Sequence, residues 1–234
     1  MEYVRIVNLK KPKFFVIENV QGILEDKHKQ SLVFIIRSLQ SIGYSIKYQL
    51  LNAADYKIPQ DRFRVFFVGI RNDLQNRFTF PNAVADKKIT LKEAIGDIIE
   101  SPRFFNDEMV TEEHPTRKNH DVYIGSYDAK YMARNRVRSW NEQSFTIQAQ
   151  ARNEPQHPQA PKMTYVNSDK RIFAKGYEHL YRRLSVRECA RIQTFSDSFV
   201  FIYTDIKNGY KMVGNAVPPR LAYAIAIQVR KAMY

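Results

Sequence analysis

The 234-residue sequence is poor in several residue types, and each scarcity excludes a class of protein. Its single cysteine, Cys189, excludes an intrachain disulfide framework and fits a reducing cytoplasm. No apolar run approaches the ~20 residues that cross a bilayer, and the N-terminus lacks the apolar core of a signal peptide. Acidic residues are also scarce, because 24 Asp and Glu stand against 37 Lys and Arg.

The resulting net charge of +13 is the most informative property of the composition. Such an excess favours a polyanionic partner, most often nucleic acid. A membrane surface fits less well, because no basic amphipathic helix with an exposed apolar face is present. Residues 117–183 alone carry 13 Lys and Arg against 6 Asp and Glu, a local net charge of +7, so more than half of the excess lies there.

The first 70 residues have the apolar patterns of a piece of an α/β sheet. They predict helix, strand, helix, strand, loop, strand, with the helices at 1–9 and 32–42 and the strands at 14–17, 44–56 (with its exit loop) and 65–70. The stretch Phe-Phe-Val-Ile-Glu-Asn-Val at 14–20 delivers Glu18 to the carboxyl end of a buried strand, where open α/β sheets keep their chemistry. Taken alone, it fits equally well a core strand that ends in a solvated acid.

From about residue 72 to 183 the strand-like segments are short and the loops long. We expect a smaller, mostly β or irregular domain here, with a strand over 144–150. Ser185-Val186-Arg187-Glu188 is a capping box that opens a helix through about Thr194. A turn is expected at 210–215, and Pro218-Pro219 begin a last helix. The predicted division is 1–95 for part of the α/β domain, 96–183 for the small domain and 184–234 for a return to the first.

Four short blocks carry the functional signal. They are Glu-Asn-Val at 18–20, Gln-Asp-Arg-Phe-Arg at 60–64, Arg-Leu-Ser-Val-Arg-Glu-Cys-Ala-Arg-Ile-Gln-Thr-Phe at 183–195 and Gly-Asn-Ala-Val-Pro at 214–218. An isolated Q-x-R-x-R is more often a pair of solvated arginines, although two such arginines at a strand start can point toward one site. In this order, the four blocks resemble the later motifs of the bacterial DNA cytosine-5 methyltransferases over essentially the whole chain. The segments 134–140 (Arg-Asn-Arg-Val-Arg-Ser-Trp) and 157–161 (His-Pro-Gln-Ala-Pro) resemble the GGCC-specific members.

The resemblance implies an incomplete Rossmann-like, S-adenosylmethionine-dependent methyltransferase sheet with a target-recognition domain at 96–183. In that family a cysteine thiolate adds to carbon 6 of a flipped cytosine, so that carbon 5 can attack the methyl group of the cofactor. Glu18 matches the acid at ring nitrogen 3, and Arg64 matches the arginine at the exocyclic oxygen. Arg62 matches the arginine that supports the nucleophile loop and phosphate. Asn215 and Ala216 match the motif that holds the methionine end of S-adenosylmethionine.

Double-stranded DNA, with GGCC as the expected site, is the partner that the resemblance and the charge imply. Arginine meets both major-groove acceptors of guanine, so the DNA candidates are arginines, joined by Gln60. For Arg136 and Arg152, the sequence favours a contact with a base and a contact with a phosphate equally. For Arg134 and Arg138 it favours a contact with a phosphate. The sequence predicts no metal site.

The departures from the family pattern matter as much as the matches. The nucleophilic Pro-Cys loop and the glycine-rich cofactor loop lie upstream of Glu-Asn-Val, yet only 17 residues precede Glu18 and none is cysteine. Cys189 falls within a predicted helix, which indicates a buried structural thiol. We therefore expect a C-terminal part of a cytoplasmic, nucleoid-associated methyltransferase (a split subunit, an alternative start or a frameshift product) that needs a complementing N-terminal polypeptide. The alternatives are a non-catalytic, sequence-specific DNA-binding module and a decayed fragment.

Overall fold

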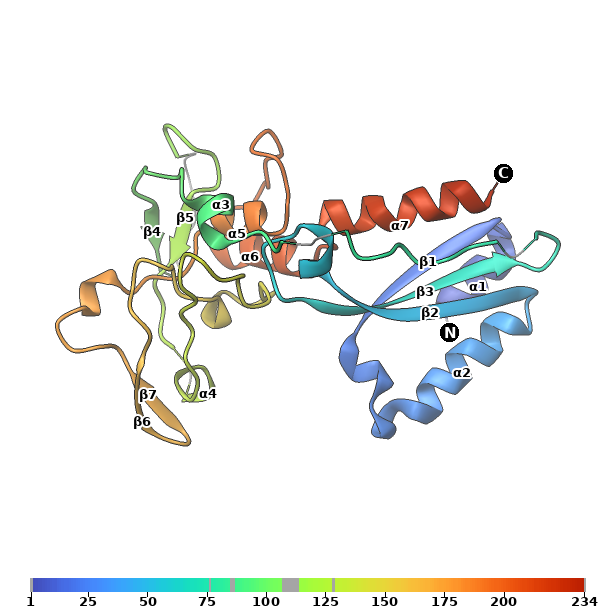
Figure 1. Cartoon of the computed structure of the whole chain (residues 1–234), viewed down its shortest axis with the longest axis horizontal. Helices are drawn as coiled ribbons and strands as arrows, with labels where there is room; N and C mark the ends of the chain where they lie inside the picture. The colour runs from blue at the N-terminus through green and yellow to red at the C-terminus, as the bar shows by residue number, and fades with distance from the viewer. Residues whose placement is uncertain (1, 76, 85–86, 107–113, 128, 234) are drawn as a thin grey trace.

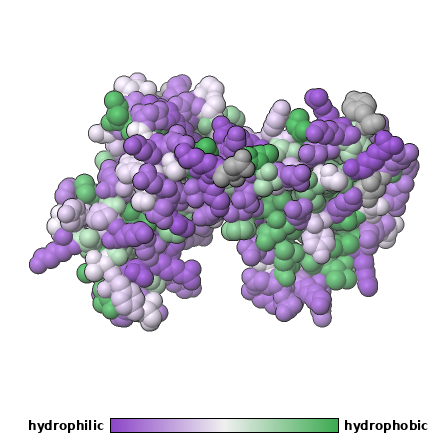
Figure 2. All heavy atoms as spheres, in the orientation of Figure 1, coloured by the Kyte–Doolittle hydropathy of each residue, from purple (hydrophilic) through white to green (hydrophobic). Residues whose placement is uncertain are grey.

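The chain forms two lobes that lie side by side along its long axis (Figure 1). The structure, a computed structural model, describes residues 2–75, 77–84, 87–106, 114–127 and 129–233. Figure 2 shows a deep indentation between the lobes on one side of the molecule. Within the described ranges, no helix is long and apolar enough to cross a membrane.

The first lobe is built on a three-stranded sheet of β1 (Phe14–Val20), β2 (Tyr44–Asn52) and β3 (Phe63–Arg71). The strand order is β1-β3-β2, and β3 pairs with both neighbours in antiparallel fashion. Residues 65–70 of β3 are all buried, because this central strand is covered on both faces and therefore reads as a continuous apolar run. The three predicted strands are confirmed.

Helices cover both faces of this sheet (Figure 1). On one face, α1 (Glu2–Lys10) and α2 (Lys29–Gln40) pack around Val7, Phe15 and Leu39. On the other, α7 (Pro219–Ala232) buries Leu221 and Ile225 against Phe66. All three helices are confirmed, except that Met1 of the predicted first helix lies outside the described residues. Short 3-10 helices follow β1 (Gln21–Leu24 and Asp26–His28) and β2 (Ala53–Tyr56).

The second lobe consists of short elements joined by long loops, as predicted for residues 72–183, and it also contains two helices from the segment predicted to return to the first domain. Its helices are α3 (Leu91–Ile95), α4 (Ala129–Met132), α5 (Val186–Ile192) and α6 (Ile206–Asn215), with 3-10 turns at Ala151–Asn153 and Glu178–Leu180. β4 (Arg103–Phe105) pairs in parallel with β5 (Asp121–Tyr123), and β6 (Thr164–Asn167) pairs antiparallel with β7 (Lys170–Ile172).

One hydrophobic core runs across both predicted domain boundaries. It joins Leu91 of α3, Tyr123 of β5 and Ile147 to buried residues of α5 and α6, among them Cys189 and Val213. The helices α5 and α6 thus belong to the packing of the second lobe. After α6 the chain returns to the sheet of the first lobe through Val217 and α7.

Two local predictions were wrong. The segment 144–150 forms no strand, because its pairing with the chain before β3 is an isolated bridge between Ser144 and Gln60. In this bridge the Asp61 N–H donates to the Ser144 carbonyl and the Ser144 N–H to the Pro59 carbonyl, both at 2.9 Å. The expected turn at 210–215 is the second half of α6, which the Asp205 side chain caps by accepting from Lys207 N. Gly209 obscured the helical pattern, and it is glycine because the ring of Tyr203 packs where a Cβ would lie.

Candidate catalytic and DNA-binding site

Glu18 and Arg64 form an ion pair across two neighbouring strands, with 2.7 Å between Glu18 Oε1 and Arg64 Nε. The antiparallel register is the cause, because it sets Val20 at the end of β1 opposite Arg64 at the start of β3. The Glu18 side chain remains 26% exposed and that of Arg64 15%, so the pair is accessible from outside. Burial lowers the pKa of Arg64, and the carboxylate of Glu18 opposes that effect.

Arg62 precedes β3 and is 1% exposed. Its guanidinium donates to the carbonyls of Ile147 (3.0 Å), Gly214 (2.8 Å) and Ala216 (3.3 Å), which ties the entrance of β3 to the end of α6. Burial, followed by the nearby positive charge of Arg64, lowers the pKa of Arg62 to about 10. The two arginines therefore share one neighbourhood but bind different partners. This placement gives Arg62 a structural task, and a contact with a nucleophile loop or phosphate stays a prediction.

Gln60, a predicted DNA contact, is fully buried. Its carbonyl oxygen accepts from Ile147 N at 2.8 Å and its amide donates to Gln193 Oε1 at 3.0 Å. This use of the side chain inside the protein argues against a contact with DNA.

Asn215 is the last residue of α6 and is exposed, and Ala216 follows it at the helix C-cap. Asn215 lines an open hollow of about 500 Å³ between α6 and the segment before it. Lys211 and Asn208 of the same helix line this hollow too, together with Ile202. A hollow with two amides, one ammonium group and apolar side chains in its walls can accept an organic ligand that carries a carboxylate.

Cys189 is confirmed as a buried thiol. Its Sγ lies 3.7 Å from Oε2 of Glu154, a carboxyl group that is itself fully buried. Burial raises the pKa of both groups well above their ordinary values, so the neutral carboxylic acid and the neutral thiol are favoured. A thiol in this environment does not serve as a nucleophile.

The four candidate DNA-binding arginines differ in their surroundings. Arg138 contacts Glu142 (3.1 Å) and Asp61 (3.5 Å) and lies over the ring of Phe145. The Nε of Arg136 donates to the Tyr131 carbonyl at 3.0 Å, and its guanidinium stacks on the Tyr131 ring. Arg134 and Arg152 are both exposed.

The two segments that resemble GGCC-specific enzymes lie side by side. The Gln156 N–H donates to the Arg136 carbonyl at 2.9 Å, and a parallel bridge joins Gln156 to Val137. His157 is buried, with its Nε2 3.5 Å from Glu188 Oε1. Burial lowers the pKa of His157 to about 4 even though Glu188 acts in the opposite direction. The structure therefore makes one surface of two segments that are separate in the sequence.

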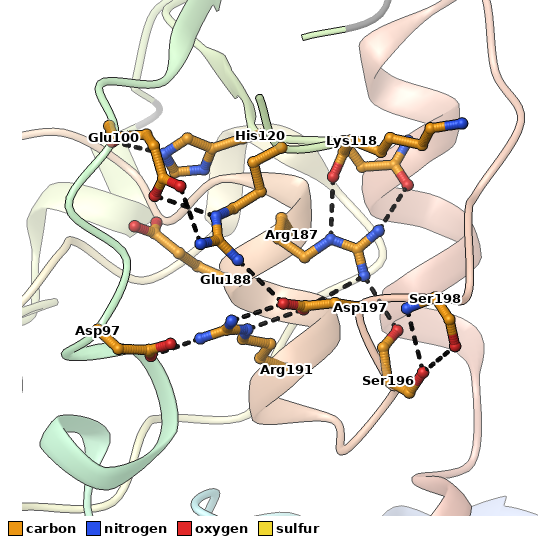
Figure 3. A network of polar contacts seen from close by, with 12 residues as sticks. Asp97, Glu100, Lys118, His120, Arg187, Glu188, Arg191, Ser196, Asp197 and Ser198 are labelled. Atoms are coloured by element: carbon orange, nitrogen blue, oxygen red, sulfur yellow. Dashed lines mark hydrogen bonds and ion pairs between the residues drawn. The ribbon is translucent and has the colours of Figure 1, made fainter. Parts of the chain in front are cut away.

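A network of ion pairs braces α5 from outside (Figure 3). Arg191 bridges Asp97 and Asp197, and Arg117 bridges Glu100 and Asp197. The hydrogen bond from Arg117 lowers the pKa of Glu100 to about 2. These ion pairs fix α5 relative to the loops at 97–100 and 196–198.

Two residues of this neighbourhood were missed from the sequence. Gln193 lies within the motif at 183–195, and that membership was the only available signal. No sequence pattern indicated that Glu154 is buried, because an acid between Asn153 and Pro155 is typical of a solvated loop. Among the described residues, no three His, Cys, Asp or Glu side chains gather in a way that could hold a metal ion.

Comparison with known proteins assigns this arrangement to a family. Residues 1–231 match the family model of the C-5 cytosine-specific DNA methylases. The Type II methyltransferase M.MthTI of Methanothermobacter thermautotrophicus is 48% identical over 98% of this chain and 69% of its own length. M.FnuDI of Fusobacterium nucleatum is 44% identical over 99% of this chain and 68% of its own length.

Solved structures agree on the fold. A prophage-encoded DNA modification methyltransferase of E. coli superimposes with a TM-score of 0.71 at 18% identity, covering 99% of this chain and 72% of that chain. The Dnmt2 methyltransferase of S. pombe gives a TM-score of 0.55 at 14% identity, covering 95% of this chain and 68% of that chain.

Proposed function

Because this chain belongs to the C-5 cytosine-specific DNA methylase family, we propose that it carries the base-activating and DNA-reading part of a restriction-modification methyltransferase. The observation that carries the proposal is the Glu18–Arg64 ion pair, which is partly exposed at the first lobe. Because both side chains are partly exposed, a base that enters the site could contact them.

The pair suits an electron-rich ring that must accept charge during attack. The Glu18 carboxyl group would hold a hydrogen bond or a proton at ring nitrogen 3 of cytosine, so that negative charge does not build up there. A guanidinium has five N–H donors, and the contacts of Arg64 with Glu18 and the Phe63 carbonyl leave others for the exocyclic oxygen. Arg64 thereby orients Glu18 as well as the base.

The end of α6 fits the methionine portion of S-adenosylmethionine, the methyl donor of this family. Asn215 and Ala216 would hold it, because the Asn215 amide lies at an open hollow and can bond a carboxylate or an ammonium group. The cofactor supplies the methyl group, and these residues bind and orient its methionine end.

The nucleophilic cysteine must come from sequence outside these 234 residues, because Cys189 is the only cysteine and is buried. The chain matches about two thirds of each relative's length. Within the described residues β1 pairs with β3 alone, and Val16 and Val20 are 43% and 55% exposed. We propose that a complementing polypeptide extends this sheet at β1 into a Rossmann-like sheet and brings the Pro-Cys and glycine-rich loops.

Double-stranded DNA is proposed to enter the indentation between the lobes, with the exposed arginines of the second lobe reading GGCC. The excess of basic residues there and the adjacency of the segments at 134–140 and 157–161 support this assignment. We place the enzyme in the cytoplasm with the nucleoid, where this substrate lies.

The test is reconstitution. The purified chain, labelled S-adenosylmethionine and GGCC duplex should give no methyl incorporation, whereas adding a polypeptide that carries the Pro-Cys and glycine-rich loops of a relative such as M.MthTI should restore it. A duplex with one substituted base pair serves as the specificity control. Specific DNA binding with no methyl transfer after complementation would favour the non-catalytic binding module instead.

A further inference from the structure

We propose that Gln193 is a positioning residue that, through a buried amide relay with Gln60, holds the Asn215 turn in its cofactor-binding geometry. The inference rests on the proposed role of Asn215. It concerns a fully buried side chain that lies 133 positions from its relay partner.

The relay is part of a closed ring of hydrogen bonds. The Ile147 N–H donates to Gln60 (2.8 Å), Gln60 donates to Gln193 (3.0 Å), and Gln193 donates to the Val213 carbonyl (2.9 Å). Arg62 closes the ring, because its guanidinium reaches both the Ile147 carbonyl at 3.0 Å and the Gly214 carbonyl at 2.8 Å. Gln60 and Gln193 are both fully buried and Arg62 is 1% exposed, so water does not compete for these bonds.

Both ends of the relay are backbone groups, and they fix the direction of each amide. The Ile147 N–H can only donate, so the oxygen of Gln60 must face it and the NH₂ group must face Gln193. The Val213 carbonyl can only accept, so the NH₂ group of Gln193 must face it and the oxygen must face Gln60. Turning over either amide would set like groups against each other in a buried site.

The ring holds the backbone on both sides of Asn215. The Gly214 carbonyl accepts from Arg62, and the Ala216 carbonyl accepts from Arg62 at 3.3 Å and Gln193 at 3.4 Å. Carbonyls at the end of a helix lack partners within the helix, so these donors decide how the chain leaves α6. A Cβ on Gly214 would overlap the Gln148 carbonyl, which leaves the turn little room to shift.

The same ring contains the entrance of β3, which carries Arg64 two residues after Arg62. The catalytic pair and the Asn215 turn are therefore held in one rigid frame. Loss of the relay hydrogen bonds should disturb the Asn215 turn before it disturbs Arg64, because Arg62 still holds the entrance of β3. The expected signature is a weakened affinity for S-adenosylmethionine with little change in the affinity for DNA.

The first experiment is hydrogen exchange on the 234-residue chain alone. Gln193→Met keeps the side-chain volume and removes the polar amide, so amides 214–217 should exchange about tenfold faster. Gln143→Met is the matched control, because its amide donates to the Ile89 carbonyl outside the ring. Equal acceleration in both variants, or acceleration throughout α5 and α6, would reduce Gln193 to a general packing residue and overturn the proposal.

The second experiment uses the complemented enzyme, whose wild-type activity tests the proposed function separately. Gln193→Met should raise KM for S-adenosylmethionine about tenfold, with kcat and KM for DNA within about twofold. Gln60→Glu keeps the acceptor for Ile147 N–H and loses the donor to Gln193, so it should move KM in the same direction. A fall in kcat with unchanged cofactor KM in both variants would refute the positioning role even if the wild-type enzyme is active.

Discussion

The indole of Trp140 meets the imidazole of His157 edge-on, with 5.2 Å between the ring centroids. This ring contact joins the two segments that resemble GGCC-specific enzymes, 134–140 and 157–161. The arginines that precede Trp140 are thereby braced by a segment that follows Arg152. The proposed DNA specificity of this lobe would therefore depend on two chain segments that pack together, and it can be tested one arginine at a time.

Arg152 distinguishes base reading from phosphate contact. If it reads a guanine, Arg152→Ala in the complemented enzyme should cost about 1–3 kcal/mol for the cognate duplex and relax the preference at one base pair. Arg152→Lys keeps the charge but loses the planar fork, so it should show nearly the same loss. Titrations at two salt concentrations provide the measurement. Uniform weakening over all duplexes, with recovery in the lysine variant, would make Arg152 a phosphate contact.

Loss of either member of the Glu18–Arg64 pair should stop methyl transfer more than it weakens DNA binding. Glu18→Gln and Arg64→Ala should each lower kcat of the complemented enzyme by about 10²–10³, the usual effect of removing a charge-stabilising contact. Methyl incorporation at saturating DNA measures this. Glu25→Gln, at an exposed ion pair with Lys27, is the control and should retain full turnover. Near-wild-type turnover in both site variants would show that the Glu18–Arg64 pair takes no part in the reaction.

The chain without its complement should self-associate through β1. An unpaired strand edge that bears exposed valines is a template for another chain. Val16→Lys should therefore shift sedimentation toward the monomer. Ile99→Lys changes a residue that is 89% exposed in the other lobe and should leave association unchanged. A wild-type chain that stays monomeric at high concentration would contradict the prediction.

The buried His157 should make the fold sensitive to mild acid. Burial lowers its pKa from an ordinary 6.5 to about 4, so between these values the unfolded chain binds a proton that the folded chain does not. Stability should therefore fall as pH drops through this window, by up to roughly 3 kcal/mol. Denaturant titrations at pH 7 and pH 4.5 measure the effect.

His157→Gln should show a smaller loss over the same window. Glu188 titrates outside this window, because burial raises its pKa but the charge and hydrogen bond of Arg182, together with His157 and His120, outweigh burial and lower the pKa to about 2. Its contribution is lost only below about pH 4.5, as the carboxylate is protonated. Parallel pH profiles for wild type and variant would exclude His157 as the cause.

The sequence predicts the first lobe well because its signals are local. The apolar run before Glu18, the helical spacing from Leu32 to Ile42 and the two prolines at 218–219 each depend on nearby residues. The capping box at Ser185 was confirmed for the same reason, with Ser185 accepting from Glu188 N and the Glu188 carboxylate from Ser185 N.

The remaining features depend on contacts that no local pattern encodes. Arg62 and Arg64 are two residues apart and look equivalent, yet one donates to carbonyls more than 80 positions away while the other pairs with Glu18. The segment 144–150 has strand-like residues but meets the chain before β3 instead of a strand. The half of α6 after Gly209 was missed because glycine weakens a helical pattern whatever packs against it.

The hydrophobic core that α3, α5 and α6 share has a practical meaning for building hybrid enzymes. A recognition module cut at residues 96 and 183 would leave behind the helices on which it folds, and both pieces would expose apolar surface. The better boundaries for a graft are the two points where the chain crosses between the lobes, just before α3 and between α6 and α7. A cassette that spans roughly residues 90–216 carries its own core, and a specificity graft from a relative should follow those joints.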